Sequence, residues 1–204
     1  MDFKLYLITD RNMPKGGLVA AIEEALIAGV RAVQLREKDI SVKDLTELAI
    51  KLRVLTSKYG AKLLINDRLD VALSVGADGV HLGQSSFTAD VVRRVVGDRP
   101  FIIGVSTHGV DEAMKAQDKG ADFITIGPVY ETASKLQYGV PVGVTIIEEV
   151  KEWVQIPCFA IGGIKTDNVK EVLDYGADGV ALISAILAAD DVRRESEKFM
   201  ELLK

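Results

Sequence analysis

The sequence predicts a (β/α)8 TIM barrel that forms a single domain over residues 1–204. Short apolar runs alternate with amphipathic stretches along the chain, which is the pattern of repeated βα units. The runs are apolar throughout, as expected of parallel strands that are covered on both faces. A phrase in which a glycine leads directly into a strand recurs at Gly29, Gly76, Gly120 and Gly176. An open doubly wound sheet is the alternative, but its G-x-G-x-x-G fingerprint is missing after the first run.

The apolar runs predict eight strands, each followed by a helix. We expect the strands at residues 4–9, 32–36, 62–66, 79–82, 101–105, 123–127, 158–162 and 179–183. We expect the helices to begin near Gly17, Val42, Arg68, Thr88, Val110, Val144, Lys165 and Ala185, several of them after a residue that can cap the first turn. Eight units in a chain of this length correspond to a compact barrel.

The repeated glycine has a physical reason. A glycine can take the left-handed conformation that ends a helix, and the chain then turns directly into the next strand. Such loops lie at the N-terminal ends of the barrel strands, where residues serve stability more often than catalysis. Asp78, Asp122 and Asp178 follow three of these glycines. We therefore expect them to be turn-stabilising residues.

Composition excludes several classes of function. The formal net charge is −5, with charged residues spread along the chain, which argues against nucleic acid or an anionic membrane as a partner. The chain has neither an N-terminal charged and apolar leader nor an apolar run long enough for a membrane span, so a cytoplasmic protein is expected. The single cysteine, Cys158, is expected to be a buried strand residue. The sequence does not predict the oligomeric state, and a homo-oligomer is possible.

The residues just past each strand should converge on one face of the barrel and carry its chemistry. They are mainly cations, amides and hydroxyls with few carboxylates, which suits small phosphorylated substrates more than a glycosidase or protease reaction. These residues are Thr9, Asp10, Gln34, Arg36, Lys38, Asn66, Asp67, Arg68, Gly83, Gln84, Ser106, His108, Thr132, Ser134, Lys135, Gly162, Gly163 and Ser184.

Two segments predict separate anion sites. The runs "AIGGI" and "ISAI" follow the seventh and eighth strands, where barrels often bind a phosphate, although the two glycines could instead only shape a tight turn. In "QLREK", the residues Gln34, Arg36 and Lys38 occupy alternate positions and would share one side if the strand continued. They could bind a second anionic group, or form a salt-bridged layer that closes the barrel.

Four further features leave alternatives open. Asp67 in "INDR" could cap the next helix or help to hold Mg²⁺. His108 could be a general acid or base, or only a hydrogen-bonding residue. His81 lies within a strand and is expected to be a core histidine. The segment from Tyr130 to Val144 could be a lid that brings Thr132, Ser134 and Lys135 to a ligand, or an inert surface loop.

These residues resemble the thiamine-phosphate synthases, also called thiamine-phosphate pyrophosphorylases, and the related thiazole tautomerases. The motifs that carry the resemblance are "LYLITDR", "QLREK", "INDR", "GADGVHLGQ", "GVSTH", "IGPVYETASK", "AIGGI" and "GADGVALISAI". They occur in this order over most of the chain, and the family fold is a (β/α)8 barrel. The resemblance implies condensation of 4-amino-5-hydroxymethyl-2-methylpyrimidine diphosphate with 4-methyl-5-(2-hydroxyethyl)thiazole phosphate, giving thiamine phosphate and pyrophosphate.

The resemblance also implies roles for individual residues. Those expected to bind the pyrimidine diphosphate are Gln34, Arg36, Lys38, Asn66 and Ser106. Those expected to bind the thiazole phosphate are Thr132, Ser134, Lys135, Gly163, Ile183 and Ser184. Asp67 would hold Mg²⁺, and the metal would act with Arg36, Lys38 and Lys135 to stabilise the leaving pyrophosphate.

One position departs from the synthase pattern. The synthases usually place a second Mg²⁺-binding aspartate two residues after the glutamine of "HLGQ", whereas this chain has Ser86. A serine there resembles the tautomerase branch, in which His108 would be the acid or base, although the intact "QLREK" and "NDR" favour the synthase. A barrel that binds thiamine precursors without catalysis is a further alternative. A sugar-phosphate epimerase would need paired carboxylates or a set of histidine ligands, which the strand ends lack.

Overall fold

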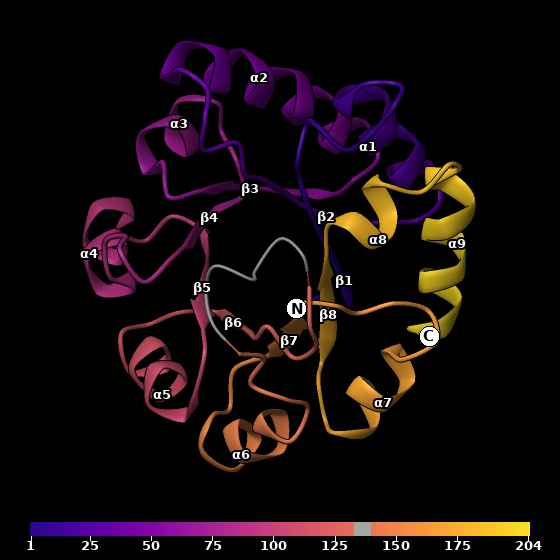
Figure 1. Cartoon of the computed structure of the whole chain (residues 1–204). Helices are drawn as coiled ribbons and strands as arrows, with labels where there is room; N and C mark the ends of the chain where they lie inside the picture. Colours follow the sequence, from indigo (N-terminus) through magenta and orange to yellow (C-terminus); the bar gives the residue numbers. More distant parts are fainter. Residues whose placement is uncertain (133–139) are drawn as a thin grey trace.

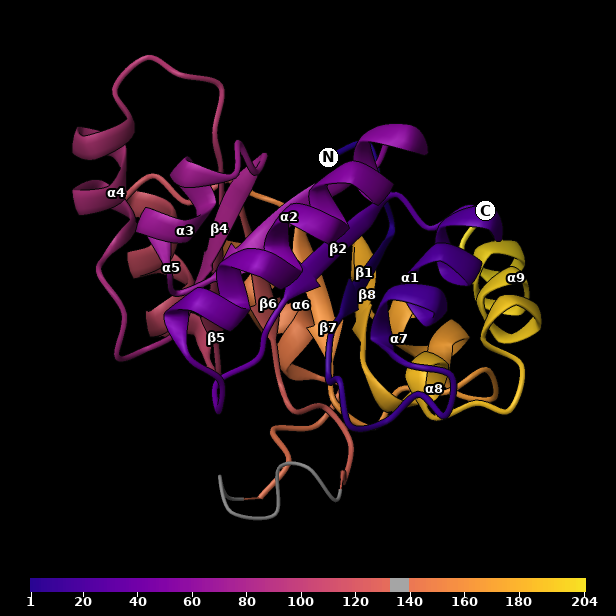
Figure 2. The same ribbon diagram turned by 90° about the horizontal axis from the view of Figure 1, so that it is seen from above.

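Eight parallel strands form a closed barrel in the order of the sequence, with the helices around the outside (Figure 1). This computed structural model describes residues 1–132 and 140–204. Figure 2 shows the barrel from the side, with the N terminus at one end and the described residues that directly follow the sixth strand at the other. The predicted (β/α)8 barrel is confirmed.

The strands lie where the apolar runs place them. They are β1 (Leu5–Ile8), β2 (Ala32–Leu35), β3 (Lys62–Asn66), β4 (Gly79–Leu82), β5 (Ile102–Thr107), β6 (Phe123–Ile126), β7 (Cys158–Ile161) and β8 (Gly179–Leu182). Two ends differ in ways that affect the site. β2 stops at Leu35, one residue early, and β5 continues to Thr107, so Ser106 is a strand residue.

Nine helices are present in the described residues, one more than the sequence predicts. They are α1 (Leu18–Ile27), α2 (Val42–Lys58), α3 (Leu69–Ser74), α4 (Ala89–Val96), α5 (Val110–Asp118), α6 (Ile146–Trp153), α7 (Val169–Asp174), α8 (Ser184–Leu187) and α9 (Val192–Leu202). The predicted last helix is divided because Asp191 caps a new one, accepting a hydrogen bond from Arg194 N at 2.9 Å. In the part of the chain that the structure covers, no helix has both the length and the apolar character to cross a membrane.

Three aspartates clamp the N-terminal end of the barrel, as the sequence predicts. Each donates its backbone N–H to a carbonyl at the start of the preceding strand, and its carboxylate accepts the N–H of that same residue. The pairs are Asp78 with Leu63, Asp122 with Ile103, and Asp178 with Cys158. A cation from the helix before that strand completes each aspartate clamp: Arg53, Arg93 or Lys151.

The barrel interior is filled with aromatic side chains at the same end. Phe3, Tyr6, Phe123 and Phe159 pack ring against ring, with centroids 5.3–6.1 Å apart. Gly104 makes this packing feasible, because a Cβ there would lie 2.4 Å from the Phe123 ring. The aromatic layer fills the N-terminal end of the barrel interior, so ligand sites are expected at the other end.

Candidate active site

A cavity of about 620 Å³ opens among the C-terminal ends of β5 to β8. Its size suits a small-molecule ligand. Six of the predicted site residues line it: Ser106, His108, Thr132, Gly163, Ile183 and Ser184. The cavity therefore brings together four of the six residues assigned to the thiazole phosphate, namely Thr132, Gly163, Ile183 and Ser184. Ser134 and Lys135 lie outside the described residues.

Gly162 and Gly163 have backbone conformations that their surroundings require. Their φ angles are 100° and 67°. A Cβ on Gly162 would lie 2.5 Å from Pro128 Cβ, and one on Gly163 would lie 2.6 Å from Tyr130 Cβ. Asn168 fixes the same loop by donating to Gly163 O at 3.1 Å. The glycine pair thus lets the loop after β7 pack directly against the loop after β6, beside the cavity.

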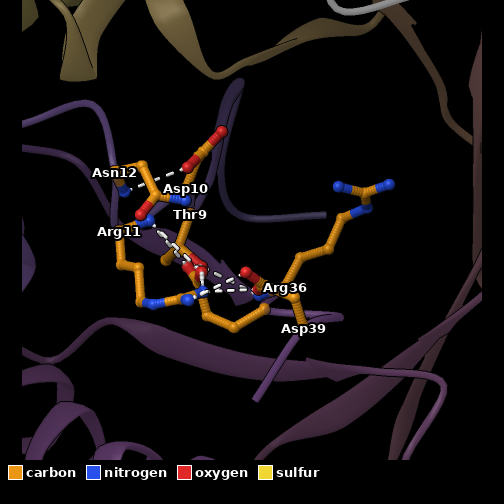
Figure 3. A network of polar contacts seen from close by, with 7 residues as sticks. Thr9, Asp10, Arg11, Asn12, Arg36 and Asp39 are labelled. Atoms are coloured by element: carbon orange, nitrogen blue, oxygen red, sulfur yellow. Dashed lines mark hydrogen bonds and ion pairs between the residues drawn. The ribbon is translucent and has the colours of Figure 1, made fainter.

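The residues of "QLREK" do not share one environment, because β2 ends at Leu35. Gln34 is 1% exposed inside the barrel and donates to Tyr6 Oη at 3.1 Å. Arg36 is half-buried and Lys38 is exposed. Arg36 makes no side-chain hydrogen bond or ion pair with a described residue, and its guanidinium extends away from the neighbouring polar cluster (Figure 3). Arg36 is thus a cation at the strand ends whose side chain has no ion-pair partner among the described residues.

The polar cluster beside Arg36 is centred on Glu37, a residue outside the predicted site. The Glu37 side chain is 2% exposed and accepts hydrogen bonds from Thr9 Oγ1 at 2.7 Å and from Arg11 N at 3.1 Å. Arg11 Nη1 also donates to Glu37, at 3.2 Å, and pairs with Asp39 at 2.5 Å. Thr9 Oγ1 in turn accepts the N–H of Arg36 at 2.9 Å. The cluster ties the loop after β1 to the loop after β2.

The ion pairs of this cluster affect the pKa of its outer carboxylate. The Arg11 guanidinium beside Asp39 holds the pKa of that carboxyl below its usual range. The sequence left open a salt-bridged layer formed by Gln34, Arg36 and Lys38, but among the described residues the salt bridges beside β2 are formed by Arg11, Glu37 and Asp39. The Arg36 guanidinium takes no part in them.

Asp67 has the geometry of a strained site residue. Its φ is 58°, the only positive φ among the described residues other than glycine. Its carboxylate accepts hydrogen bonds from Asn66 Nδ2 at 2.7 Å and Gly83 N at 3.2 Å, and from the Ser86 hydroxyl. It does not cap the following helix, since α3 begins after Arg68 without a side-chain cap. The capping alternative for Asp67 is therefore wrong.

The donors around Asp67 bear on the expected Mg²⁺. No group of three or more His, Cys, Asp or Glu residues in residues 1–132 and 140–204 is placed to hold a metal ion. A single carboxylate with nearby hydroxyl and amide groups fits Mg²⁺ only if the ion takes most of its ligands from substrate phosphates and water, which is its usual habit. Ser86 is bound to Asp67 itself and adds no charge.

The two histidines have different roles. His81 is buried between Tyr6 and Phe123, and its Nε2 lies 3.0 Å from Ser106 Oγ. Burial lowers the pKa of His81 to about 3, so the ring is neutral at pH 7. The negative charge of Asp67 opposes this shift, and the positive charge of Arg36 adds to it. The prediction of a core histidine is confirmed. His108 is half-exposed at the cavity, with Nδ1 3.0 Å from Glu112 Oε2 of α5.

Comparison with known proteins decides the family. The family model described as thiamine monophosphate synthase matches residues 5–186 of the chain. The chain belongs to the thiamine monophosphate synthase family. This confirms the resemblance that the motifs indicate, and it covers all eight strands of the barrel.

Individual relatives of this family match the whole chain. A protein of Geobacter sulfurreducens is 52% identical over all of this chain and 95% of its own length. The thiamine-phosphate synthase of Clostridium novyi is 43% identical over 97% of both chains. Among solved structures, the thiamine phosphate pyrophosphorylase of Pyrococcus furiosus superposes with a TM-score of 0.89 and 39% identity, covering 98% of this chain and 95% of its own. The thiamine monophosphate synthase family therefore accounts for the chain from end to end.

Proposed function

We propose that the chain is a thiamine-phosphate synthase, which joins the pyrimidine diphosphate and the thiazole phosphate to give thiamine phosphate and pyrophosphate. The match of the thiamine monophosphate synthase model to residues 5–186 carries this proposal. The relatives from Clostridium novyi and Pyrococcus furiosus bear synthase and pyrophosphorylase names, which favours this reaction over the thiazole tautomerase alternative. The substrates are charged small molecules, which supports a cytoplasmic location.

The reaction is a substitution at the pyrimidine methylene carbon. The C–O bond to the diphosphate breaks, its electron pair leaves with pyrophosphate, and the lone pair of the thiazole nitrogen forms the new C–N bond. The protein has to stabilise charge on the leaving group and hold the two rings in contact. Both tasks need fixed cations and a site that excludes water.

The leaving-group side is assigned to the ends of β2, β3 and β5. Arg36 supports this assignment because its guanidinium has no partner among the described residues and extends away from the Glu37 cluster, while Thr9 of that cluster fixes the Arg36 backbone. Lys38 and Lys135 would add positive charge as the C–O bond ionises. The remaining contacts to the pyrimidine diphosphate are assigned to Gln34, Asn66 and Ser106.

The thiazole phosphate is assigned to the cavity between β6 and β8. Thr132, Gly163, Ile183 and Ser184 line this cavity, which supports their role. α8 is a single turn, so the backbone N–H groups and the Ser184 hydroxyl would bind the phosphate more than the helix dipole would. Ser134 is assigned to the same phosphate from its motif alone.

Mg²⁺ is assigned to Asp67. When bound, it would neutralise part of the charge on the pyrophosphate group. Because one carboxylate is available, we expect the metal to bind together with the diphosphate and only weakly without it. Binding of Mn²⁺, used as a spectroscopic substitute, tests this: affinity should rise strongly when inorganic pyrophosphate is added. Ser86→Asp should tighten Mn²⁺ binding without pyrophosphate, and tight binding of the ion alone to the unaltered protein would contradict the assignment.

The reaction itself is tested by incubating the purified protein with both substrates, with and without Mg²⁺, and measuring thiamine phosphate and pyrophosphate. Metal-dependent formation of both products in equal amounts is the expected result. A folded protein that forms neither product would refute the proposed function. In that case isomerisation of a thiazole carboxylate phosphate, with His108→Gln as the diagnostic variant, is the reaction to assay.

A further inference from the structure

A chain of polar groups runs through the aromatic core from β2 to β5. Gln34 Nε2 donates to Tyr6 Oη at 3.1 Å, Tyr6 Oη lies 3.5 Å from His81 Nδ1, and His81 Nε2 lies 3.0 Å from Ser106 Oγ. Gln34, Tyr6 and His81 are each at most 2% exposed. Ser106 is the member that reaches the cavity. The four side chains therefore connect the interior of the barrel to a residue assigned to the substrate.

Hydrogen bonding restricts this chain to two directions. A neutral imidazole carries one N–H and one lone pair, so His81 donates to one neighbour and accepts from the other. If Tyr6 donates to Nδ1, then Nε2–H donates to Ser106. If His81 instead donates to Tyr6, the Tyr6 hydroxyl needs the oxygen of the Gln34 amide as its acceptor, and Ser106 must donate inward. A mixed arrangement leaves one buried polar atom without a partner, which is unfavourable.

The two directions give Ser106 opposite properties at the cavity. With the outward direction, the Ser106 oxygen accepts from His81 and its O–H remains for a ligand. With the inward direction, the O–H is used by His81 and only lone pairs face the ligand. Lone pairs would repel an acceptor atom of an anionic substrate, whereas an O–H would bind it.

We propose that Tyr6 and His81 are positioning residues. Tyr6 holds His81 in the Nε2–H tautomer, and His81 in turn makes Ser106 present its hydroxyl hydrogen to the pyrimidine diphosphate. The ligand half of this inference rests on the proposed function. The tautomer half rests on the Gln34 amide, which donates to Tyr6 Oη and so leaves the Tyr6 hydroxyl hydrogen for His81 Nδ1. Gln84 supports the arrangement because its side-chain amide donates to Ser106 O at 2.5 Å and so fixes the serine backbone.

The tautomer is measured directly by nitrogen NMR on protein labelled at histidine. The chain has two histidines, so a His108→Gln variant assigns the signals of His81. The expected result is a neutral ring protonated at Nε2. A ring protonated mainly at Nδ1 would overturn the inference.

Tyr6→Phe tests the connection to the ligand because it removes one hydroxyl and keeps the ring. We expect His81 to become a mixture of tautomers, and the pyrimidine diphosphate to bind roughly threefold to tenfold more weakly, as for loss of one hydrogen bond. Thr56→Val is the matched control, since Thr56 is a fully buried hydroxyl of α2 that donates to Leu52 O. It should leave both the tautomer and the binding unchanged.

The outcomes separate the two halves. If Tyr6→Phe keeps the Nε2–H tautomer and the affinity of the unaltered protein, the positioning role is wrong. If the unaltered protein has the expected tautomer but neither binds the pyrimidine diphosphate nor forms thiamine phosphate, the proposed function fails and the ligand half fails with it. Loss of tautomer bias together with weaker binding supports both.

Discussion

Replacing Glu37 with alanine should destabilise the protein and disturb the site through Arg36. The substitution leaves the fully buried Thr9 hydroxyl without its acceptor, and a stranded buried donor costs about 1–3 kcal/mol. Arg11 loses a backbone contact, but its guanidinium is 32% exposed and keeps Asp39, so it adds only about 1 kcal/mol. The sum is about 3 kcal/mol. With an unfolding entropy of about 2.1 cal/mol/K per residue, it lowers the Tm by about 7 °C.

Calorimetry and steady-state kinetics check this prediction together. Besides the lower Tm, kcat/KM should fall because Thr9, released from Glu37, no longer fixes the Arg36 backbone. Asp39→Asn is the matched control: it removes the charge of the exposed outer member of the cluster and should change the Tm by less than about 2 °C. The reasoning is refuted if Glu37→Ala melts like the unaltered protein, or if Asp39→Asn loses as much stability as Glu37→Ala.

Three further predictions concern pH, backbone strain and charge. The pKa of His81 is about 3 in the folded protein and about 6.5 in the unfolded chain. The contribution of neutral His81 to the free energy of unfolding is therefore complete above pH 6.5 and declines below it, by about 2 kcal/mol at pH 5. Urea unfolding of His81→Asn should lack this decline. Gly163→Ala should lower the Tm more than Gly60→Ala, since both have φ near +65° but only Gly163 has neighbours within 3 Å of a Cβ; equal losses would mean that conformation alone matters. Lys135→Ala should depress turnover strongly with little change in Tm, and an unfolded variant would mean that the lysine is structural.

The strands could be predicted within two residues because each is a buried apolar run bounded by polar or glycine residues. Helix starts were less certain. α7 begins at Val169, four residues after the predicted Lys165, because the Asn168 side chain accepts the N–H of Lys165 in a preceding turn. α9 was missed because its cap, Asp191, lies within a stretch that continues the polar and apolar pattern of α8.

The candidate site could be predicted only in part, since strand ends place residues on one face without fixing their partners. Gln34 followed the alternation of β2 into the barrel, but its partner Tyr6 lies 28 residues away in β1. Glu37 escaped notice because a charged residue after a strand is usually solvated, and its burial depends on Thr9 and Arg11. The positive φ of Asp67 likewise has no local signal, since aspartate tolerates the left-handed region better than most residues but adopts it in only a small minority of cases.

The aspartate clamps have a consequence for the order in which the barrel folds. Each joins a strand start to an aspartate no more than 20 residues away, as in Leu63 with Asp78, so little chain entropy is lost in forming it. The copy of the repeated phrase that begins at Ala28 has Arg31 at the aspartate position. The Arg31 side chain donates to Leu26 O and Val30 O of its own segment. We therefore expect the three clamped units to assemble first. The pairing of β1 with β8, which joins opposite ends of the sequence, should close the barrel last.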